Sequence, residues 1–503
     1  MLVAGKAVLV KVNVTNANTA EAKPAGTLRV ETSTGELVQQ LALTAPTGAV
    51  PTTVPDVPSF TNSYSVVVPA TLVKTGLRLT ASVGPGAGTS TINPRVGGGV
   101  AMRVVAVPVQ LGTTVGQIVD KADSYLLARL PVATVTVQAR APYVSKRVTT
   151  LPTTAAEWST AFSRVLAEMD DLHILEKASD QTFYYGFMPK RTFGLAGVGY
   201  VPGNAAVGFD VPNSPAVVRE TLAHELGHNL SLPHAPCGGV AGADPQYPYA
   251  NGMLGAPGRY IWGYNAETST FVDPRRTNVH DIMSYCSGDT FSDYNYRRVQ
   301  VYLTPTDRLV KTASAAAAAA GPQELLLISG QLEGGKMELM PLKSLQGEAR
   351  LPQDGPYTLR VLTAQGTVEY RFAMKVTAHE SPAQRFGFTI PNPGTILGIT
   401  IVKDGATLVQ RVTAAPRTNK SIQAATDKSP VQFSEQGGQL RLSWDHAKHP
   451  YLTVIHVGTQ RTTLAQDLEG GSVVLPAAGL PVGGAFEFSL SDGLNTARVT
   501  LNR

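Results

Sequence analysis

Short runs that alternate hydrophobic and polar residues dominate the first part of the chain. Five such runs, separated by clusters of Pro, Gly and Thr, lie at 8–14, 27–32, 37–43, 64–68 and 77–83. A period of two is typical of half-buried strands, and regularly spaced turn residues are typical of a sandwich. We therefore predict a β-sandwich over residues 1–96, which ends in a Gly/Pro-rich linker at 84–99.

After residue 97 the pattern changes to strands that alternate with helices. Apolar runs predict strands at 102–109, 132–139, 182–188 and 194–209. A helical pattern at 115–128 lies between the first two of these strands. Thr154 and Glu157 have the spacing of a capping box, which predicts the start of an amphipathic helix that ends near Asp170.

Strand patterns return toward the C-terminal end. An Ala-rich stretch at 313–320, closed by Gly321, predicts a helical spacer after a second domain at 97–312. Beyond it, strand patterns at 357–363, 368–376, 440–444 and 485–490 predict two further sandwiches, over 322–418 and 425–503. We therefore expect a multidomain chain, in which an α+β domain is flanked by immunoglobulin-like all-β sandwiches.

Composition and charge exclude some classes of function. The chain has 503 residues, of which 43% are hydrophobic, so it can bury several cores. Its net charge of +5, without a Lys/Arg-rich block, argues against a nucleic-acid partner. No run approaches the roughly 18 apolar residues that a membrane span needs. The first residues resemble a strand and not an export signal, and we interpret the start as that of a mature form whose leader has been removed.

The residues with candidate chemistry lie at the end of a helix that Ser214 and Pro215 predict to begin there. Residues 224–234 have the sequence His-Glu-Leu-Gly-His-Asn-Leu-Ser-Leu-Pro-His. His224 and His228 are four residues apart on this helix, so their imidazoles project from the same face and can bind one metal ion. His234 could complete a three-histidine site with an open fourth position, which is the arrangement of catalytic zinc sites.

Glu225, next to the first of these histidines, can act as the general base for a water that the metal activates. A His pair on a helix can also belong to an ordinary surface or core. However, the chain has only nine His, so a chance match to the whole pattern is rare. Three imidazoles and an open position suit zinc better than other divalent ions.

These residues resemble the metzincin metalloproteases, whose motif is His-Glu-x-x-His-x-x-Gly-x-x-His followed by a Met-containing turn. The turn is present as Asp-Ile-Met-Ser-Tyr at 281–285, about 50 residues after the third His. The resemblance covers about 97–312 and implies that Met283 forms an apolar floor beneath the metal. It also implies that Tyr285 supports the developing oxyanion. Packing in the core is the alternative for Tyr285, and Asp281 is a candidate partner of a metal-binding His.

Two positions depart from the family pattern. Ser231 stands where the family has a Gly that permits a sharp turn before the third His. A left-handed conformation at Ser costs about 1 kcal/mol, so the turn remains feasible. Ala235 follows the third His where reprolysin-like members have Asp, so the chain does not fit that branch.

The chain has only two cysteines, Cys237 and Cys286, which lie three residues after His234 and Met283 respectively. If the metal site assembles as the resemblance implies, its two walls bring the thiols together, and we expect a disulfide. In the chain-entropy model this bond contributes about 4 kcal/mol, and it indicates an oxidising compartment. A further metal ligand is the alternative role for a cysteine, but it would leave no open position.

The sequence therefore predicts a secreted zinc-dependent endopeptidase that hydrolyses peptide bonds of extracellular proteins. Its layout is similar to that of StcE-type mucin-cleaving proteases, which adds O-glycosylated, mucin-like proteins as a candidate substrate class. The alternative is a cell-surface adhesin or glycan-binding protein, in which the β domains contact glycans and the zinc domain is auxiliary. The stretch 197–209 could form an edge strand that pairs with an extended substrate, or an ordinary strand.

Overall fold

The computed structural model describes residues 1–17, 22–85, 88–189, 194–304, 321–378, 383–413, 420–421 and 429–503. The predicted spacer at 313–320 lies outside the described residues. These described parts are mostly β-sheet and contain four α-helices. They fall into two compact units: unit 1 comprises 1–102, 121–136 and 235–308, and unit 2 comprises 103–120, 137–234 and 309–503. None of the helices in the described part of the chain has the length and hydrophobicity that a membrane-spanning helix requires.

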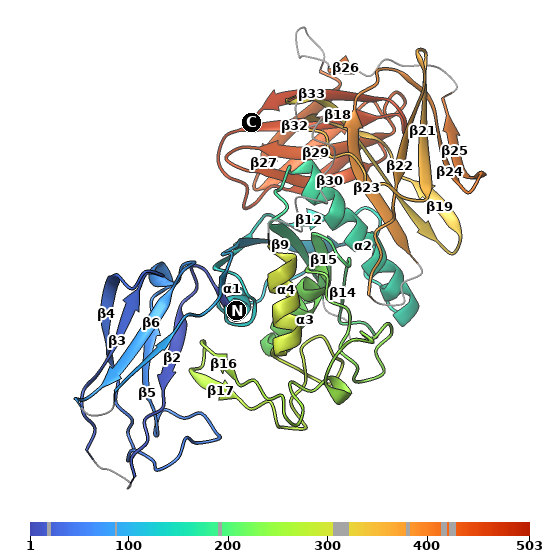
Figure 1. The fold of residues 1–503 in the computed structure, drawn as a ribbon. Coiled ribbons are helices and arrows are strands. Elements are labelled where there is room, and N and C mark those ends of the chain that lie inside the picture. Colours follow the sequence, from blue (N-terminus) through green and yellow to red (C-terminus); the bar gives the residue numbers. More distant parts are fainter. Residues whose placement is uncertain are drawn as a thin grey trace. The chain divides into compact units, whose positions relative to one another are not determined.

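The N-terminal part of unit 1 is built from short strands, five of which lie where the alternating pattern predicts them (Figure 1). They are β1 (Leu2–Val3), β2 (Val8–Val12), β3 (Gly26–Glu31), β4 (Leu37–Leu43), β5 (Tyr64–Val68), β6 (Arg78–Val83), β7 (Thr89–Ile92) and β8 (Val96–Gly97). One sheet has the order β4-β3-β6-β7, and the others pair β2 with β5 and β1 with β8. Leu28, Val30, Tyr64 and Val68 are buried in one core between the sheets. The stretch predicted as a linker contributes β7 and β8.

The rest of unit 1 is mostly loop. It contains α1 (Ala122–Arg129), β16 (Gly263–Asn265), β17 (Thr270–Val272) and α4 (Asp293–Tyr302), with a 3-10 turn at Ala250–Gly252. A second 3-10 turn, Ala70–Leu72, lies between β5 and β6 of the N-terminal part. Helix α1 is shorter than the helix predicted at 115–128. The reason is that Thr114 and Val115 pair with β9 as a short strand, and the Gly116 N–H donates to Val109 O at 2.9 Å.

A seven-stranded sheet forms the core of the region that carries the histidines. Its strands are β9 (Ala101–Leu111), β10 (Thr114–Val115), β11 (Thr134–Ala139), β12 (Tyr143–Val144), β13 (Thr182–Met188), β14 (Gly197–Gly199) and β15 (Ala205–Phe209). The main order is β10-β9-β13-β15-β14. Strand β13 is parallel to β9 and β15, whereas β14 is antiparallel to β15. The predicted strand at 194–209 is therefore a hairpin, and β14 is the edge.

Two helices pack on this sheet, α2 (Ala155–Leu175) and α3 (Pro215–Asn229). The predicted capping box is present at the start of α2, where the Thr154 hydroxyl accepts from the Glu157 N–H and the Glu157 carboxylate accepts from the Thr154 N–H. Large side chains of the β14–β15 hairpin, such as Val207 and Phe209, join α2 in one hydrophobic cluster. Glycines at alternate positions of the same strands contact α3. Helix α2 thus packs on large side chains of the hairpin, whereas α3 packs on its glycines.

The C-terminal part of unit 2 contains four sheets, ordered β19-β18-β20 with β23, β22-β21-β24-β25, β26-β33-β32-β29-β30, and β27-β28-β31. The strands of the first two sheets are β18 (Gln323–Glu333), β19 (Lys336–Leu339), β20 (Lys343–Gly347), β21 (Tyr357–Thr363), β22 (Gly366–Phe372), β23 (Gln384–Pro391), β24 (Ile396–Lys403) and β25 (Ala406–Val412). The other strands are β26 (Lys420–Ser421), β27 (Val431–Gln436), β28 (Gln439–Trp444), β29 (Tyr451–Val457), β30 (Arg461–Leu468), β31 (Ser472–Pro476), β32 (Ala485–Ser491) and β33 (Thr496–Asn502). Two hydrophobic cores fill these sheets.

Buried charges join helix α2 to the sandwich that contains β18 and β23. Arg385 on β23 is 2% exposed and forms ion pairs with Asp171 and, at 3.4 Å, with Asp170. The Lys375 ammonium lies 2.5 Å from the Asp170 carboxylate. Burial alone would raise the pKa of Asp170, but the positive charges of Lys375 and Arg385 outweigh it and lower that pKa. The charged form of Asp170 is therefore stabilised by its two cationic partners.

Backbone contacts reinforce this junction. Val201, just beyond the edge strand, donates its N–H to Val376 O at 2.9 Å, and Tyr200 forms a bridge with Thr377. The sandwich that begins at residue 323 is thus packed against the helix and sheet that support the histidines. It is a part of unit 2 and not a separately tethered module.

We expect Arg385→Ala to lower the free energy of unfolding by about 3–5 kcal/mol, because it leaves two buried carboxylates without their guanidinium. Urea unfolding monitored by circular dichroism measures the change. The matched control is Arg360→Ala, which breaks an ion pair with Glu369 whose side chains are 49% and 53% exposed. That variant should change stability by less than about 1 kcal/mol. Equal effects of the two substitutions would contradict a structural role for the buried pair.

Candidate active site

Helix α3 carries two of the histidines and the glutamate in its last turns. It begins at Pro215, with Ser214 as its N-cap as predicted, although the Ser214 side chain makes no capping hydrogen bond. Leu222 and Leu226 are fully buried and anchor the helix. The helix ends at Asn229, one residue after His228.

The turn after α3 reverses the chain by means of Ser231. This residue has φ 71°, in the left-handed region, where the family pattern has Gly. Its N–H donates to His228 O at 2.9 Å, and the next N–H, of Leu232, donates to Gly227 O at 3.0 Å. These two bonds form a Schellman motif that closes the helix. The sharp turn therefore forms although Ser stands in place of the family's Gly. It carries the chain back toward His234.

The three histidines meet at their Nε2 atoms. His228 Nε2 lies 3.1 Å from His224 Nε2 and 3.2 Å from His234 Nε2. Nitrogens that share one tetrahedral zinc ion at about 2.0–2.1 Å stand about 3.3 Å apart. These two distances therefore fit nitrogens that share one zinc ion, and three imidazoles would leave a tetrahedral ion one position for water or substrate.

A backbone contact orients the central imidazole. His228 Nδ1 lies 2.7 Å from Leu232 O, and a carbonyl only accepts, so Nδ1 carries the proton and donates. The lone pair of the neutral ring is then on Nε2, the atom that faces the other two histidines. His228 and His234 are fully buried, and His224 is 8% exposed. The Schellman turn thus shapes the chain and sets the tautomer of a ligand.

Glu225 is buried beside this cluster, with 2% of its surface exposed. Edge strand β14 packs directly against it, since a Cβ added to Gly197 would lie 2.8 Å from Glu225 Cγ and Oε1. Such a contact is possible only because residue 197 has no side chain. The carboxylate of Glu225 is therefore held between α3 and the edge of the sheet.

Asn229 is a further residue of the site that the sequence analysis did not identify. It is fully buried, and its side-chain amide donates to Tyr200 O at 3.0 Å and to Ala205 O at 2.8 Å. These carbonyls flank the connection between β14 and β15, so Asn229 ties the hairpin to the end of α3. The sequence does contain a signal for this role, because Asn is poorly suited to a helix and here it stands in the buried last turn of one.

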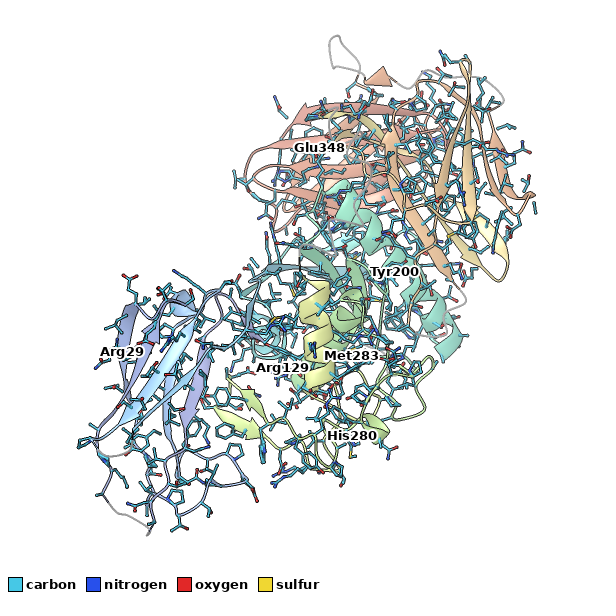
Figure 2. The ribbon with its side chains drawn as sticks, in the orientation of Figure 1. Arg29, Arg129, Tyr200, His280, Met283 and Glu348 are labelled. Atoms are coloured by element: carbon cyan, nitrogen blue, oxygen red, sulfur yellow. A yellow bond between two sulfur atoms is a disulfide. The ribbon has the colours of Figure 1, made fainter. Side chains whose placement is uncertain are left out.

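The predicted Met-turn lies in unit 1 and is organised by Asp281 (Figure 2 labels the neighbouring Met283 and His280). The fully buried carboxylate of Asp281 accepts from the N–H groups of Met283 and Ser292, at 2.8 and 2.7 Å. It also accepts from the Asn295 amide at 3.0 Å and the Tyr247 hydroxyl at 3.2 Å. Burial raises the pKa of Asp281. Asp281 therefore holds the Met-turn to the start of α4. It does not act as the expected partner of a metal-binding His, because these hydrogen bonds engage its carboxylate.

The predicted disulfide between Cys237 and Cys286 is confirmed, with a Cα–Cα distance of 5.7 Å. The sulfurs lie close to the imidazole of His280, but both are committed to the disulfide, which argues against a cysteine as metal ligand. Two backbone bonds join the same segments, from Tyr285 N to Cys237 O at 3.1 Å and from Ala235 N to Met283 O at 3.0 Å. Ala235 directly follows His234 in the chain.

The structure thus gathers the predicted residues in two groups. His224, His228, His234 and Glu225 lie together in unit 2, whereas Met283, Tyr285, Cys237 and Cys286 lie together in unit 1. Met283 is fully buried. The Tyr285 side chain is 44% exposed, which does not fit the alternative of core packing.

Comparison with known proteins bears on the same segment. Residues 192–306, which include all of these candidate residues, match the model of the family described as Peptidase M66. The match supports a metallopeptidase.

Two relatives match shorter parts of the chain. A dictomallein-like protein of Hahella chejuensis is 35% identical over 86 residues, which cover 17% of this chain and 12% of that protein.

The second relative, dictomallein-4 of Dictyostelium discoideum, is 36% identical over 94 residues, which cover 15% of each chain. The matched parts are therefore less than one sixth of the length of either relative. Among solved structures, a two-domain fibronectin type III segment of chicken tenascin is 14% identical and covers 36% of this chain and 98% of that one, with a TM-score of 0.13. A biofilm-associated protein domain is 15% identical, with a TM-score of 0.11, and covers 32% and 27%. Scores this low carry no argument about the fold.

We expect Ser231→Gly to raise the free energy of unfolding by about 1 kcal/mol, because Gly adopts the left-handed conformation without the cost of a Cβ. Thermal or urea unfolding measures the change. The matched control is Ser159→Gly at an exposed position of α2, where Gly should lower stability by about 0.5 kcal/mol. A destabilising Ser231→Gly would show that the Ser side chain, and not the backbone turn, is what matters there.

Proposed function

We propose that the chain is a zinc endopeptidase of the metzincin type, with its catalytic domain within about 97–312. The observation that carries this proposal is the convergence of three imidazole Nε2 atoms beside a buried glutamate. These residues all lie in the segment that matches a metallopeptidase family. His224, His228 and His234 would hold the ion. When bound, zinc polarises the substrate carbonyl and lowers the pKa of water.

Glu225 would serve as the general base. Its carboxylate would take the proton of the attacking water and deliver it to the nitrogen of the leaving amine. Burial next to the histidines suits this role, because little bulk water competes for the carboxylate. Tyr285 and Met283 keep the roles that the metzincin resemblance implies, as a hydroxyl donor to the developing oxyanion and as an apolar floor. The exposure of Tyr285 is in keeping with a group that meets substrate.

The proposed substrate is an extended stretch of protein chain. Strand β14 is an edge with a partner on one side only, β15, among the described strands. An extended peptide can add to such an edge by main-chain hydrogen bonds, and here it would pass the carboxylate that packs against Gly197. The disulfide supports an extracellular location. We include O-glycosylated, mucin-like proteins among the proposed substrates, with their glycans contacting the β domains. Only the domain layout of the chain supports this part of the proposal.

The test of the mechanism is Glu225→Gln, which keeps the size of the side chain and removes the base. We expect hydrolysis to fall by at least about 100-fold, as for the loss of a general base, with one zinc per chain retained by elemental mass spectrometry. Glu220→Gln on the same helix is the matched control, because this half-buried residue lies outside the cluster. It should keep full activity.

His228→Ala should instead lose the metal as well as activity. New N-termini, mapped by mass spectrometry on plain proteins and on mucin-type glycoproteins, show which substrates are cut. Undiminished cleavage by Glu225→Gln would refute the mechanism. Cuts confined to glycosylated stretches would support the glycoprotein substrate, and cuts across plain proteins would replace it by a broad endopeptidase.

A further inference from the structure

Two glycines that lie opposite each other in the β14–β15 hairpin leave a gap on the side of the sheet that faces α3. Gly197 and Gly208 are direct partners in the antiparallel register. A Cβ on Gly197 would lie 2.8 Å from Glu225 Oε1, and a Cβ on Gly208 would lie 2.0 Å from the Tyr185 hydroxyl oxygen. Both would also meet the methyl group of Thr221, at 2.9 and 3.3 Å. We call the space bounded by these two glycines and Thr221 the glycine slot.

Two polar groups from different elements enter the glycine slot. Tyr185 comes from the central strand β13, where its partner on β15 is Ala206, and Glu225 comes from α3. Tyr185 is fully buried, and its ring lies 4.8 Å from that of Phe187. Any side chain larger than Gly at 197 or 208 would displace one of the two polar groups. The two paired glycines therefore leave room for a carboxylate at one position of the hairpin and for a hydroxyl at the position opposite.

The Tyr185 hydroxyl is an anomaly in this environment. Among the described residues it has no hydrogen-bond partner, although it is buried. A buried hydroxyl without a partner lowers stability, and Phe would fill the same space without that cost. Burial raises the pKa of Tyr185, and the negative charge of Glu225 raises it further, which agrees with the closeness of the two groups. The cost of this hydroxyl suggests that it forms a hydrogen bond in another state of the protein, such as the substrate-bound state.

We propose that Tyr185 is a positioning residue for Glu225, whose hydroxyl donates a hydrogen bond to the Glu225 carboxylate in the substrate-bound enzyme. The inference rests on the proposed function, in which Glu225 is the general base. Hydrogen bonds of catalytic groups are often long in the free enzyme and tighten only in the complex. Held by Tyr185 through one oxygen, the carboxylate presents its other oxygen to the attacking water. Tyr185 approaches from strand β13, on the side of Gly208, and in this role it would contact the base and not the substrate or the metal.

The direct test is Tyr185→Phe, which removes only the hydroxyl. We expect kcat to fall about tenfold or more, with KM within about twofold of the wild type and the zinc content unchanged. The unfolding temperature should stay the same or rise, because the buried hydroxyl had no partner to lose. A merely structural tyrosine gives the opposite pattern, with lower stability and unchanged kcat.

The matched control is Tyr184→Phe on the same strand. Its side chain belongs to the α2 cluster on the other face of the sheet, and its hydroxyl donates to Glu176 at 2.7 Å. This variant should lower the unfolding temperature and leave kcat unchanged. The pair of substitutions therefore separates the loss of a hydroxyl near the base from the loss of a structural hydrogen bond.

A second variant displaces the hydroxyl without removing it. Gly208→Ala would place a Cβ 2.0 Å from the present position of the Tyr185 oxygen, so the oxygen must move and kcat should fall in the wild-type background. In the Tyr185→Phe background the same substitution should cost much less activity, because the displaced oxygen is already gone. Equal losses of kcat in the two backgrounds would overturn the inference.

The outcomes distinguish the inference from the proposed function. If the wild type cleaves and Glu225→Gln does not, wild-type kcat in Tyr185→Phe overturns the role of Tyr185 alone. If Glu225→Gln is as active as the wild type, the proposed function itself fails. Thermal unfolding of the zinc-loaded protein adds a readout without activity. The effect of Tyr185→Phe should differ between the wild-type and Glu225→Gln backgrounds, and strictly additive effects would count against the pairing.

Discussion

The close packing of helix α3 on the hairpin at the edge of the sheet is the constraint on which the candidate site depends. Gly197, Gly199 and Gly208 face the helix, and a Cβ on any of them would come within 3.0 Å of a buried atom. This proximity places Glu225 against the edge strand and lets Asn229 bond the carbonyls on either side of the hairpin. With bulkier residues the helix would stand further from the sheet, and the histidines would move with it.

A rigid support keeps that packing in place. Helix α2 covers the other face of the sheet with large residues such as Trp158 and Phe162. Its buried carboxylates, Asp170 and Asp171, pair with cations of the sandwich that follows in the chain. Truncation of a partner in such a network is costly, because a charge is left buried. The sandwich therefore has a structural part in unit 2, whatever it binds at its outer surface.

Local patterns predicted much of the fold. The strand at 182–188 and the capping box at Thr154 agree with the structure. So do the helix that begins at Pro215 and the disulfide between Cys237 and Cys286. These features depend on residues close together in sequence or on a pair with no other choice. The left-handed turn at Ser231 was also foreseen, since its cost is small beside the bonds that close the helix.

The features that sequence reasoning missed depend on contacts between distant residues. Helix α1 is shorter than predicted because Thr114 and Val115 pair with a strand. The ion pairs of α2 involve partners about 200 residues away. Alternate glycines in the hairpin were visible in the sequence, but their meaning required knowing that α3 lies on that side.

The proposed function depends most directly on the ligands of the metal. X-ray absorption spectroscopy at the zinc edge of the purified, zinc-loaded protein would measure them directly. We expect three imidazole nitrogens and one further light atom, all at about 2.0–2.1 Å, and no sulfur. A sulfur at about 2.3 Å, or a first shell with fewer than three imidazoles, would contradict the proposed function.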